Sequence, residues 1–227
     1  LTASAALSVQ FEDSFAKVST LLDEGATDFA AYKQAIIAGS NETGIAVDEY
    51  AEAVYSSISA SIDQADAVQF TASMAKLAKG GFTDLSKAVD VTTTVINGYG
   101  LAASEAEGIT DILVQTQNLG KTTVDELASS MGKVIPTAAA ANYSFEELGA
   151  AYAQLTKNGI ATAESGTYLR SMLSELTKSG SITDKALRDL SGKGFAELKA
   201  EGTSTADILN MLAEYAEQDG KSLKDMF

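Results

Sequence analysis

The residue types in this chain leave little room for catalysis, because its 227 residues include neither histidine nor cysteine. Without histidine, the chain lacks the usual general base, the Ser-His-Asp and Cys-His arrangements, and the commonest metal ligand. Without cysteine, it lacks disulfides, thiolate nucleophiles and cysteine-bound metals. Its 31 acidic residues could still supply the carboxylate pair of a glycoside hydrolase. Carboxylate chemistry and phosphate binding are therefore the possibilities to look for.

Glu164, followed by Ser165, is the carboxylate that most invites a catalytic interpretation. Lytic transglycosylases, which cleave peptidoglycan, place their catalytic glutamate before a serine and follow it with a segment similar to Gly-Leu-Met-Gln. Here Tyr168-Leu-Arg-Ser-Met172 follows instead, and no such segment lies downstream. We therefore interpret Glu164 as an acidic residue in the first turn of a helix, where the helix dipole favours negative charge.

Two short fragments imitate the end of a phosphate-binding loop, Gly120-Lys-Thr122 and Gly220-Lys-Ser222. The opening glycine of such a loop would fall at Gln115 and Tyr215, and no strand precedes either fragment. The first fragment is better explained as a turn that leads into a capped helix. No calcium loop, zinc pattern or dinucleotide-binding glycine cluster is present either. We expect no catalytic residue, metal or cofactor, and we expect the chain not to be an enzyme.

The charge balance is acidic, with 16 basic and 31 acidic residues and a formal net charge of −15. This balance argues against direct nucleic acid binding, which depends on lysine and arginine neutralising phosphates. The apolar runs are shorter than the roughly 18 to 20 residues that span a bilayer. The chain begins at Leu1 without a signal-peptide pattern. We expect a soluble piece of a longer protein with no membrane segment.

Helix signals recur along the whole sequence. The chain has a single proline and no alternating run of β-branched residues, which favours an all-α fold. We expect a polar turn at 39–44, and further helix stops about twenty residues apart at Gly80, Gly100, Gly120, Asn142, Gly159, Gly180, Gly202 and Gly220. Each interval fits one helix and a tight connection. The pattern predicts an irregular array of about ten amphipathic helices, joined by short Gly/Asn turns and packed as αα-hairpins.

The N-terminal segment 1–24 is predicted to be an amphipathic helix. Its apolar residues are three or four positions apart, which places them on one face: Leu7, Phe11, Phe15, Val18 and Leu22. Two interpretations stay open for this face. It is either the seam of a coiled coil that continues from upstream sequence, or the face with which the helix docks on its own domain. Segment 25–180 is expected to form the core helical domain, and 181–227 to complete it.

The stretch 122–176 has the clearest local signals. Thr123-Val-Asp-Glu126 and Ser144-Phe-Glu-Glu147 are capping boxes, in which a hydroxyl and a glutamate satisfy the first backbone N–H groups of a helix. Asn142 and Gly159 tolerate the left-handed conformation in which many helices end. Pro136 is expected to kink or break the helix around it. The stretch therefore predicts three helices with defined ends.

This stretch resembles the core region of tail tape measure proteins from tailed phages, prophages and phage-derived particles. The resemblance begins at Phe11 and weakens after Leu176, and it rests on these motifs: Gly120-Lys-Thr-Thr-Val-Asp-Glu-Leu127, Val134-Ile-Pro-Thr-Ala138, Ser144-Phe-Glu-Glu-Leu148, Asn158-Gly-Ile160, Gly166-Thr-Tyr-Leu-Arg170 and Met172-Leu-Ser-Glu-Leu176. The family usually has alanine at Ser165 and often glycine at Asn142. Both departures keep the local geometry.

The resemblance implies a structural virion component that governs tail length and assembly. It implies a location in the tail tube interior, and in the host cytoplasm during assembly. It also implies a homo-oligomer whose partners are the tail tube protein, tail assembly chaperones, and tail tip or baseplate proteins. An acidic surface would suit a protein that shares a tube with DNA. Because turns interrupt the helices so often, we expect a folded part of the tape measure polypeptide rather than its ruler rod.

Five residues are candidates for protein contacts: Phe11, Phe15, Tyr168, Arg170 and Met172. For Arg170 two interpretations stay open, an ion pair or helix cap within the domain and a contact to another tail component. Two alternatives to the tail function also remain. One is an acidic helical adaptor module that binds another protein, and the other is a peptidoglycan-cleaving domain, which tape measure proteins can carry elsewhere in their sequence.

Overall fold

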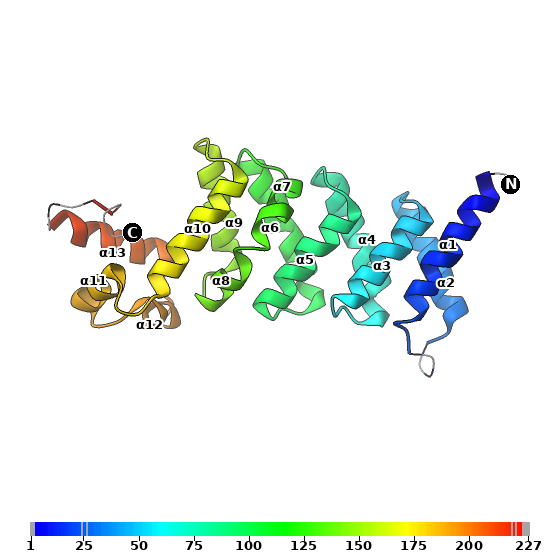
Figure 1. Cartoon of the computed structure of the whole chain (residues 1–227), viewed down its shortest axis with the longest axis horizontal. Helices are drawn as coiled ribbons and strands as arrows, with labels where there is room; N and C mark the ends of the chain where they lie inside the picture. The colour runs from blue at the N-terminus through cyan, green and yellow to red at the C-terminus, as the bar shows by residue number, and fades with distance from the viewer. Residues whose placement is uncertain (1–2, 24, 26, 219, 221, 224–227) are drawn as a thin grey trace. The chain divides into compact units, whose positions relative to one another are not determined.

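A computed structural model describes residues 3–23, 25, 27–218, 220 and 222–223, with side chains from Val9 onward (Figure 1). Within these ranges the chain forms thirteen α-helices, one 3-10 turn and no strand, which confirms the predicted all-α fold. The elements are α1 (Ala3–Ser19), α2 (Phe29–Thr43), α3 (Val47–Ser59), α4 (Gln64–Gly80), α5 (Leu85–Tyr99), η1 (Ala103–Glu105), α6 (Ala106–Leu119), α7 (Val124–Met131), α8 (Ile135–Ala140), α9 (Phe145–Lys157), α10 (Thr162–Thr177), α11 (Ile182–Ser191), α12 (Phe195–Ala200) and α13 (Thr205–Gln218).

Two compact units make up the described chain. The first contains the described residues up to Gln117 together with Thr123–Ser129. The second contains Asn118–Thr122 and the described residues from Ser130 onward. Each unit has its own contacts between helices.

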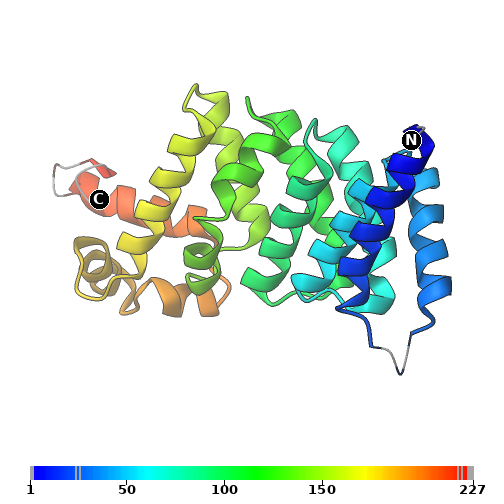
Figure 2. The ribbon, with the colours of Figure 1, turned by 45° about the vertical axis from the view of Figure 1, so that its right-hand side comes forward.

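The first unit is a two-layer stack of antiparallel helices (Figure 2). Helices α1, α3 and α5 contact one another in order, α2 contacts α4, and α3 packs against both of these helices. Each helix is too short to be stable alone in water, so burial of one apolar face against its neighbours stabilises the stack. Tyr50 of α3 is fully buried at the centre, and its hydroxyl donates to the carbonyl of Val68 at 2.7 Å.

The expected turn at 39–44 is wrong for all but its last residue, because α2 continues to Thr43 and ends at Gly44 with φ 67°. Gly39 lies inside this helix, where a Cβ would come within 2.5 Å of the Tyr50 hydroxyl. A glycine in the interior of a helix costs stability relative to alanine. Here it allows α2 to approach α3 closely. The residues next to Gly39 in the sequence do not indicate this contact.

The second unit is arranged around α10, which contacts α8, α9, α11 and α12, while α13 packs on α11 and α12. The helix ends predicted at Asn142 and Gly159 are confirmed. Asn142 adopts φ 51° and Gly159 adopts φ 92°, both in the left-handed region. Ser144 and Glu147 form the predicted capping box. Pro136 is the second residue of α8, after a break that separates α8 from α7.

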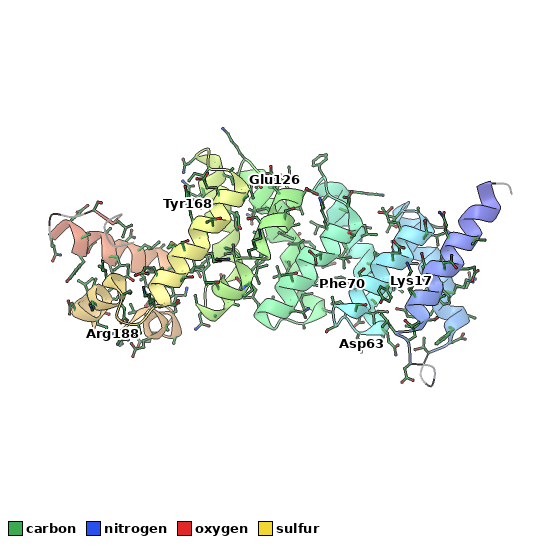
Figure 3. All side chains as sticks on the ribbon, viewed as in Figure 1. Lys17, Asp63, Phe70, Glu126, Tyr168 and Arg188 are labelled. Carbon is green, nitrogen blue, oxygen red and sulfur yellow. The ribbon has the colours of Figure 1, made fainter. Side chains whose placement is uncertain are left out.

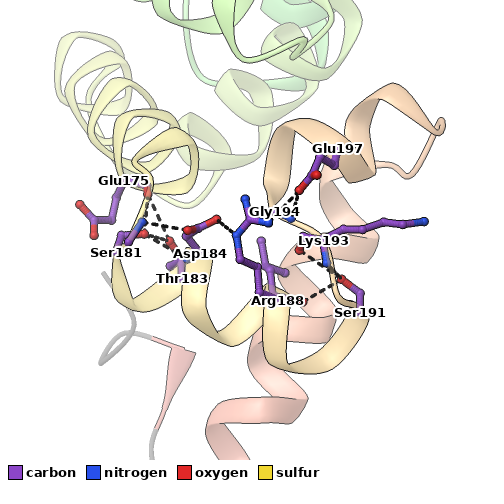
Figure 4. Close-up of polar contacts among 11 residues, drawn as sticks. Glu175, Ser181, Thr183, Asp184, Arg188, Ser191, Lys193, Gly194 and Glu197 are labelled. Carbon is purple, nitrogen blue, oxygen red and sulfur yellow. Dashed lines mark hydrogen bonds and ion pairs between the residues drawn. The ribbon is translucent and has the colours of Figure 1, made fainter.

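The C-terminal part contains a break that the sequence pattern did not predict, between α11 and α12. Gly192 ends α11 with φ 76°. A Cβ on Gly194 would lie 2.7 Å from a guanidinium nitrogen of Arg188 and 2.8 Å from a carboxylate oxygen of Asp184. Arg188 bonds Asp184 at 3.1 Å and Glu197 at 3.0 Å, so it ties the two short helices together across the glycine (Figure 4).

The carboxylate of Glu147 joins three elements of the second unit. Lys199 of α12 places its amine 2.9 and 3.0 Å from the two oxygens, and the N–H of Thr205 at the start of α13 donates to the same group at 3.1 Å. The N–H of Ser144 donates to it at 2.9 Å. The Lys199 side chain is only 9% exposed, so its charge depends on this one partner for compensation.

We predict that Glu147→Gln destabilises the chain by about 1–3 kcal/mol at pH 7, because charged hydrogen bonds are lost and Lys199 keeps an uncompensated charge. Partial burial alone would raise the pKa of Glu147, but the hydrogen bonds from Ser144, Lys199 and Thr205 outweigh it and lower the pKa below its usual 4.5. A lowered pKa means that the stabilisation is complete above the unfolded-state pKa and is lost as pH falls through the folded-state value.

Thermal unfolding followed by circular dichroism between pH 7 and pH 3 checks this prediction. The difference in Tm between the parent chain and Glu147→Gln should be full at pH 7 and should shrink in the acidic range. The neighbouring exposed carboxylate gives the control, since Glu146→Gln removes the same charge without these bonds. A difference that stays constant down to pH 3 would contradict the role of the Glu147 carboxylate.

Candidate interaction surface

Most of the motif residues lie in the second unit, on and around α10. At Gly166 this helix approaches its neighbours closely. A Cβ there would lie 2.5 Å from the Tyr152 hydroxyl and closer still to Ser130 Oγ. The Ser130 hydroxyl donates to the carbonyl of Thr162 at 3.2 Å and lies 2.8 Å from the Tyr152 hydroxyl, which therefore donates to it. Burial raises the pKa of Tyr152 to about 12, so this phenol stays neutral at physiological pH.

A second group of hydroxyls extends this contact. The Thr162 hydroxyl donates to the Thr122 hydroxyl at 2.8 Å, and the backbone N–H of Lys121 donates to the Thr156 hydroxyl at 3.2 Å. Lys121 and Thr122 belong to the first fragment that imitates a phosphate loop. Their backbone and hydroxyl groups instead join the turn to α9 and α10. In the second fragment, Lys221 lies outside the described residues.

Ser165 stands beside Gly166, fully buried, and its hydroxyl has no hydrogen-bond partner within the described residues. This is the position where the resembling family usually has alanine. A buried hydroxyl without a partner loses its hydration and gains nothing in return. Serine at position 165, where the family usually has alanine, therefore lowers the stability of the fold, which the sequence alone did not reveal.

Glu164 is in the first turn of α10, as predicted. The Tyr168 hydroxyl donates to its carboxylate, and this hydrogen bond raises the pKa of the Tyr168 phenol. Within the described residues, no group of acidic side chains is arranged to hold a metal ion. The carboxylate that most resembled a catalytic residue is thus bonded to a neighbour one helical turn away.

Phe11 and Phe15 lie in the first unit, where α1 packs against α3. Phe11 is 6% exposed and Phe15 is half-buried, with their ring centres 6.2 Å apart. The amine of Lys33 in α2 lies 5.4 and 5.5 Å from the two ring centres, within the range of a cation–π contact. Val18 and Leu22 of the same predicted face are buried as well, while the side chain of Leu7 lies outside the described residues. Phe15 therefore presents more surface to a partner than Phe11 does.

Tyr168, Arg170 and Met172 lie along the outer part of α10 (Figure 3 labels Tyr168). Tyr168 is 49% exposed, and Met172, one turn further on the same side, is half-buried. Arg170 is exposed and lies two residues after Tyr168, which places it on a different side of the helix. It forms no ion pair or hydrogen bond with any residue that the structure describes. The structure thus brings these three residues onto one helix, with Arg170 apart from the other two.

Phe82, in the turn between α4 and α5, is an exposed aromatic residue that the sequence reasoning did not single out. It is 80% exposed and adopts φ 53°, a conformation that is unfavourable for a bulky side chain. The signal that could have indicated it is a large apolar residue directly after two glycines, at an expected turn.

The family described as phage-related minor tail protein matches residues 33–227. This chain belongs to that family. A probable tape measure protein of Clostridium phage phiCD119 is 36% identical over 228 residues, which cover 96% of this chain and 24% of the relative. The tape measure protein of Pneumococcus phage Dp-1 is 21% identical over 181 residues, or 80% of this chain and 16% of the relative. No solved structure matches the chain significantly.

These matches confirm the resemblance to tape measure proteins that the motifs indicated. They support a structural role in a phage tail, and therefore in a virion, for this minor tail protein family member. The chain spans about a quarter or less of the length of these relatives, 24% and 16%. No helix in the described part of the chain combines the length and apolar character needed to cross a bilayer.

We predict that Gly166→Ala destabilises this minor tail protein by about 1–3 kcal/mol, because the added methyl group overpacks the contact with Ser130 and Tyr152. Gly108→Ala is the matched control. Gly108 is an exposed residue inside α6 with nothing near its Cβ position, so alanine should stabilise the chain by about 0.5–1 kcal/mol. Urea unfolding of both variants measures the two effects, and changes of the same sign would contradict the packing argument.

We also predict that Ser165→Ala stabilises the chain by about 1–3 kcal/mol, because it removes a buried hydroxyl that has no partner. Ser171→Ala, at an exposed position of the same helix, measures the gain from helix propensity alone. The free energy of unfolding should rise more for Ser165→Ala than for Ser171→Ala. If the two gains are equal, the Ser165 hydroxyl is satisfied in solution.

Proposed function

We propose that this chain is a folded segment of a tape measure protein that lies in the lumen of the tail tube and contributes to tail assembly and length control. The observation that carries the proposal is the regular reversal of the chain. Its longest described helices, α1 and α4, have 17 residues each, which is about 25 Å of helix at 1.5 Å per residue. An extended ruler would instead be one uninterrupted helix.

Left-handed residues support this interpretation, because they end the helices at fixed places. Gly44, Gly100 and Gly159 each adopt a positive φ directly after a helix or one residue beyond it. Straightening the chain into one rod would sacrifice the packing of both units and bury none of their apolar faces. In our proposal the folded segment acts through protein contacts, and other segments of the parent polypeptide supply the ruler.

The proposed partners are those that the tape measure role implies: the tail tube protein, tail assembly chaperones, and tail tip or baseplate proteins. Several copies would act together as a homo-oligomer, first in the host cytoplasm and then in the virion. Phe15, Tyr168, Arg170 and Met172 are the candidate contact residues with side-chain surface to offer. The net charge of −15 fits a protein that does not bind the DNA passing through the same tube.

The division into an N-terminal helix at 1–24, a core at 25–180 and a C-terminal part at 181–227 belongs to the same proposal. It treats 1–24 as the connection to upstream sequence and 181–227 as the completion of the helical core. Limited proteolysis would report on it through cleavage near residues 24 and 180.

An in-frame deletion of this segment from the parent gene tests the proposed function. Electron microscopy of the resulting particles should show absent or aberrant tails, because an assembly element is missing. If the segment were part of the ruler, normal tails shortened by about 340 Å would be expected, from 227 residues at 1.5 Å each. That result would contradict the folded-segment proposal. Tails of normal form and length would show that the segment has no part in assembly.

A further inference from the structure

Two adjoining hollows lie between α4 and α6 in the first unit. Their volumes are about 240 and 300 Å³, and both are lined by Ser73 of α4 and Glu107 of α6. We call the two together the α4–α6 groove. Residues 66–77 of α4 form one wall and residues 103–114 the other, a length of roughly three turns of helix.

The lining of the α4–α6 groove combines apolar side chains with the uncharged polar residues Gln69, Ser73, Ser104 and Thr110. Phe70 and Leu77 of α4 contribute side chains that are 5% and 3% exposed, and Ala106 of α6 is 5% exposed (Figure 3 labels Phe70). Val114 of α6 lies further along and is half-buried. Phe70, Leu77 and Ala106 are packed in the core, so their positions do not depend on a bound partner.

The rim of the groove is acidic. Asp66 of α4 and Glu107 and Asp111 of α6 are exposed, and Lys76 is the basic residue that lines it. None of these four side chains forms an ion pair or hydrogen bond with any residue that the structure describes. Other carboxylates of the chain do have such partners, for example Asp125, which bonds Thr83 and Lys87 at 3.0 and 2.6 Å. Three unpaired carboxylates thus surround the apolar lining residues.

We propose that the α4–α6 groove binds an amphipathic helix of another protein, one whose apolar stripe is flanked by lysine or arginine. Apolar residues of the helix cover the apolar lining residues, and its cations face Asp66, Glu107 and Asp111. Exposed ion pairs add little affinity, but they select the partner and speed its association. This proposal goes beyond the tail role and does not depend on it.

The same charges argue against other occupants. A second copy of this chain brings its own net charge of −15 to an acidic rim, which disfavours self-association here. Nucleic acid is disfavoured for the same reason. The carboxylates are not grouped as metal ligands in the described residues. A cationic amphipathic helix is the occupant that can both contact the apolar lining residues and pair with the acidic residues at the rim.

Two synthetic peptides of 14 residues test the proposal with the 227-residue chain. One is a helix-forming peptide with leucine at every third or fourth position and lysine on both sides of this stripe. The other has glutamate in place of each lysine. Fluorescence anisotropy should show saturable binding of the lysine peptide, with at least tenfold weaker binding of the glutamate peptide and a loss of affinity as salt rises. Absence of saturable binding by the lysine peptide overturns the proposal.

Variants locate the binding on the chain. The triple variant Asp66→Asn, Glu107→Gln, Asp111→Asn neutralises the rim, and Ser73→Tyr fills the groove. Each should weaken binding of the lysine peptide at least tenfold. Circular dichroism confirms that both variants remain folded.

Matched controls separate the groove from the general acidity of the chain. The variant Asp13→Asn, Glu49→Gln, Asp90→Asn removes the same charge from exposed positions on α1, α3 and α5. Ser86→Tyr adds the same ring to an exposed position on α5. Binding should stay within twofold of the parent chain in both. If control and groove variants lose affinity equally, the attraction is non-specific and the proposal fails.

A photoreactive residue in place of Thr110, which lines the groove, identifies the occupant in assembled particles. The proposal expects a crosslink to a basic helical segment of another protein. A crosslink to a second copy of the chain, or to another part of the same polypeptide, overturns the assignment of the partner.

Discussion

The close contact at Gly166 is the constraint on which the second unit depends. The hydroxyls of Ser130 and Tyr152 occupy the space that a side chain at position 166 would need. Helix α10 also contacts α8, α9, α11 and α12. The distance at which α10 packs at Gly166 therefore affects the positions of these helices. Packing therefore explains the glycine of this family motif, while the exposed Tyr168 and Arg170 of the same motif stay candidate contact residues.

Polar groups elsewhere in the second unit serve the same purpose. Glu147 holds α12 and the start of α13 to the first turn of α9, and Arg188 connects α11 to α12. Both contacts join helices of only six to fourteen residues, which have little apolar surface to bury. Charged hydrogen bonds fix the relative positions of such short helices, since their geometry is specific where that of apolar contacts is not. The acidic composition is thus partly structural.

Local signals predicted the helix ends but not the contacts between helices. The capping box at Ser144 and the left-handed residues Asn142 and Gly159 were predicted because each acts within one turn of its own helix. Gly39 was misread as a turn because its reason lies in Tyr50, eleven residues away on another helix. Among the candidate contact residues, the burial of Phe11 and the unpaired state of Arg170 likewise depend on tertiary neighbours. The α4–α6 groove joins residues some forty positions apart, so no local pattern could indicate it.

The distribution of unpaired charge bears on how such a segment could work inside a tail. Carboxylates that stabilise the fold, such as Glu147 and Asp125, already have cationic partners within their own unit. Those at the rim of the α4–α6 groove do not, and neither does Arg170 on α10. Groups without internal partners remain hydrated until another molecule supplies the opposite charge, so they respond to binding while the packed contacts stay unchanged. This separation of packed contacts from unpaired charges is consistent with our proposal that the segment acts through contacts rather than through its length.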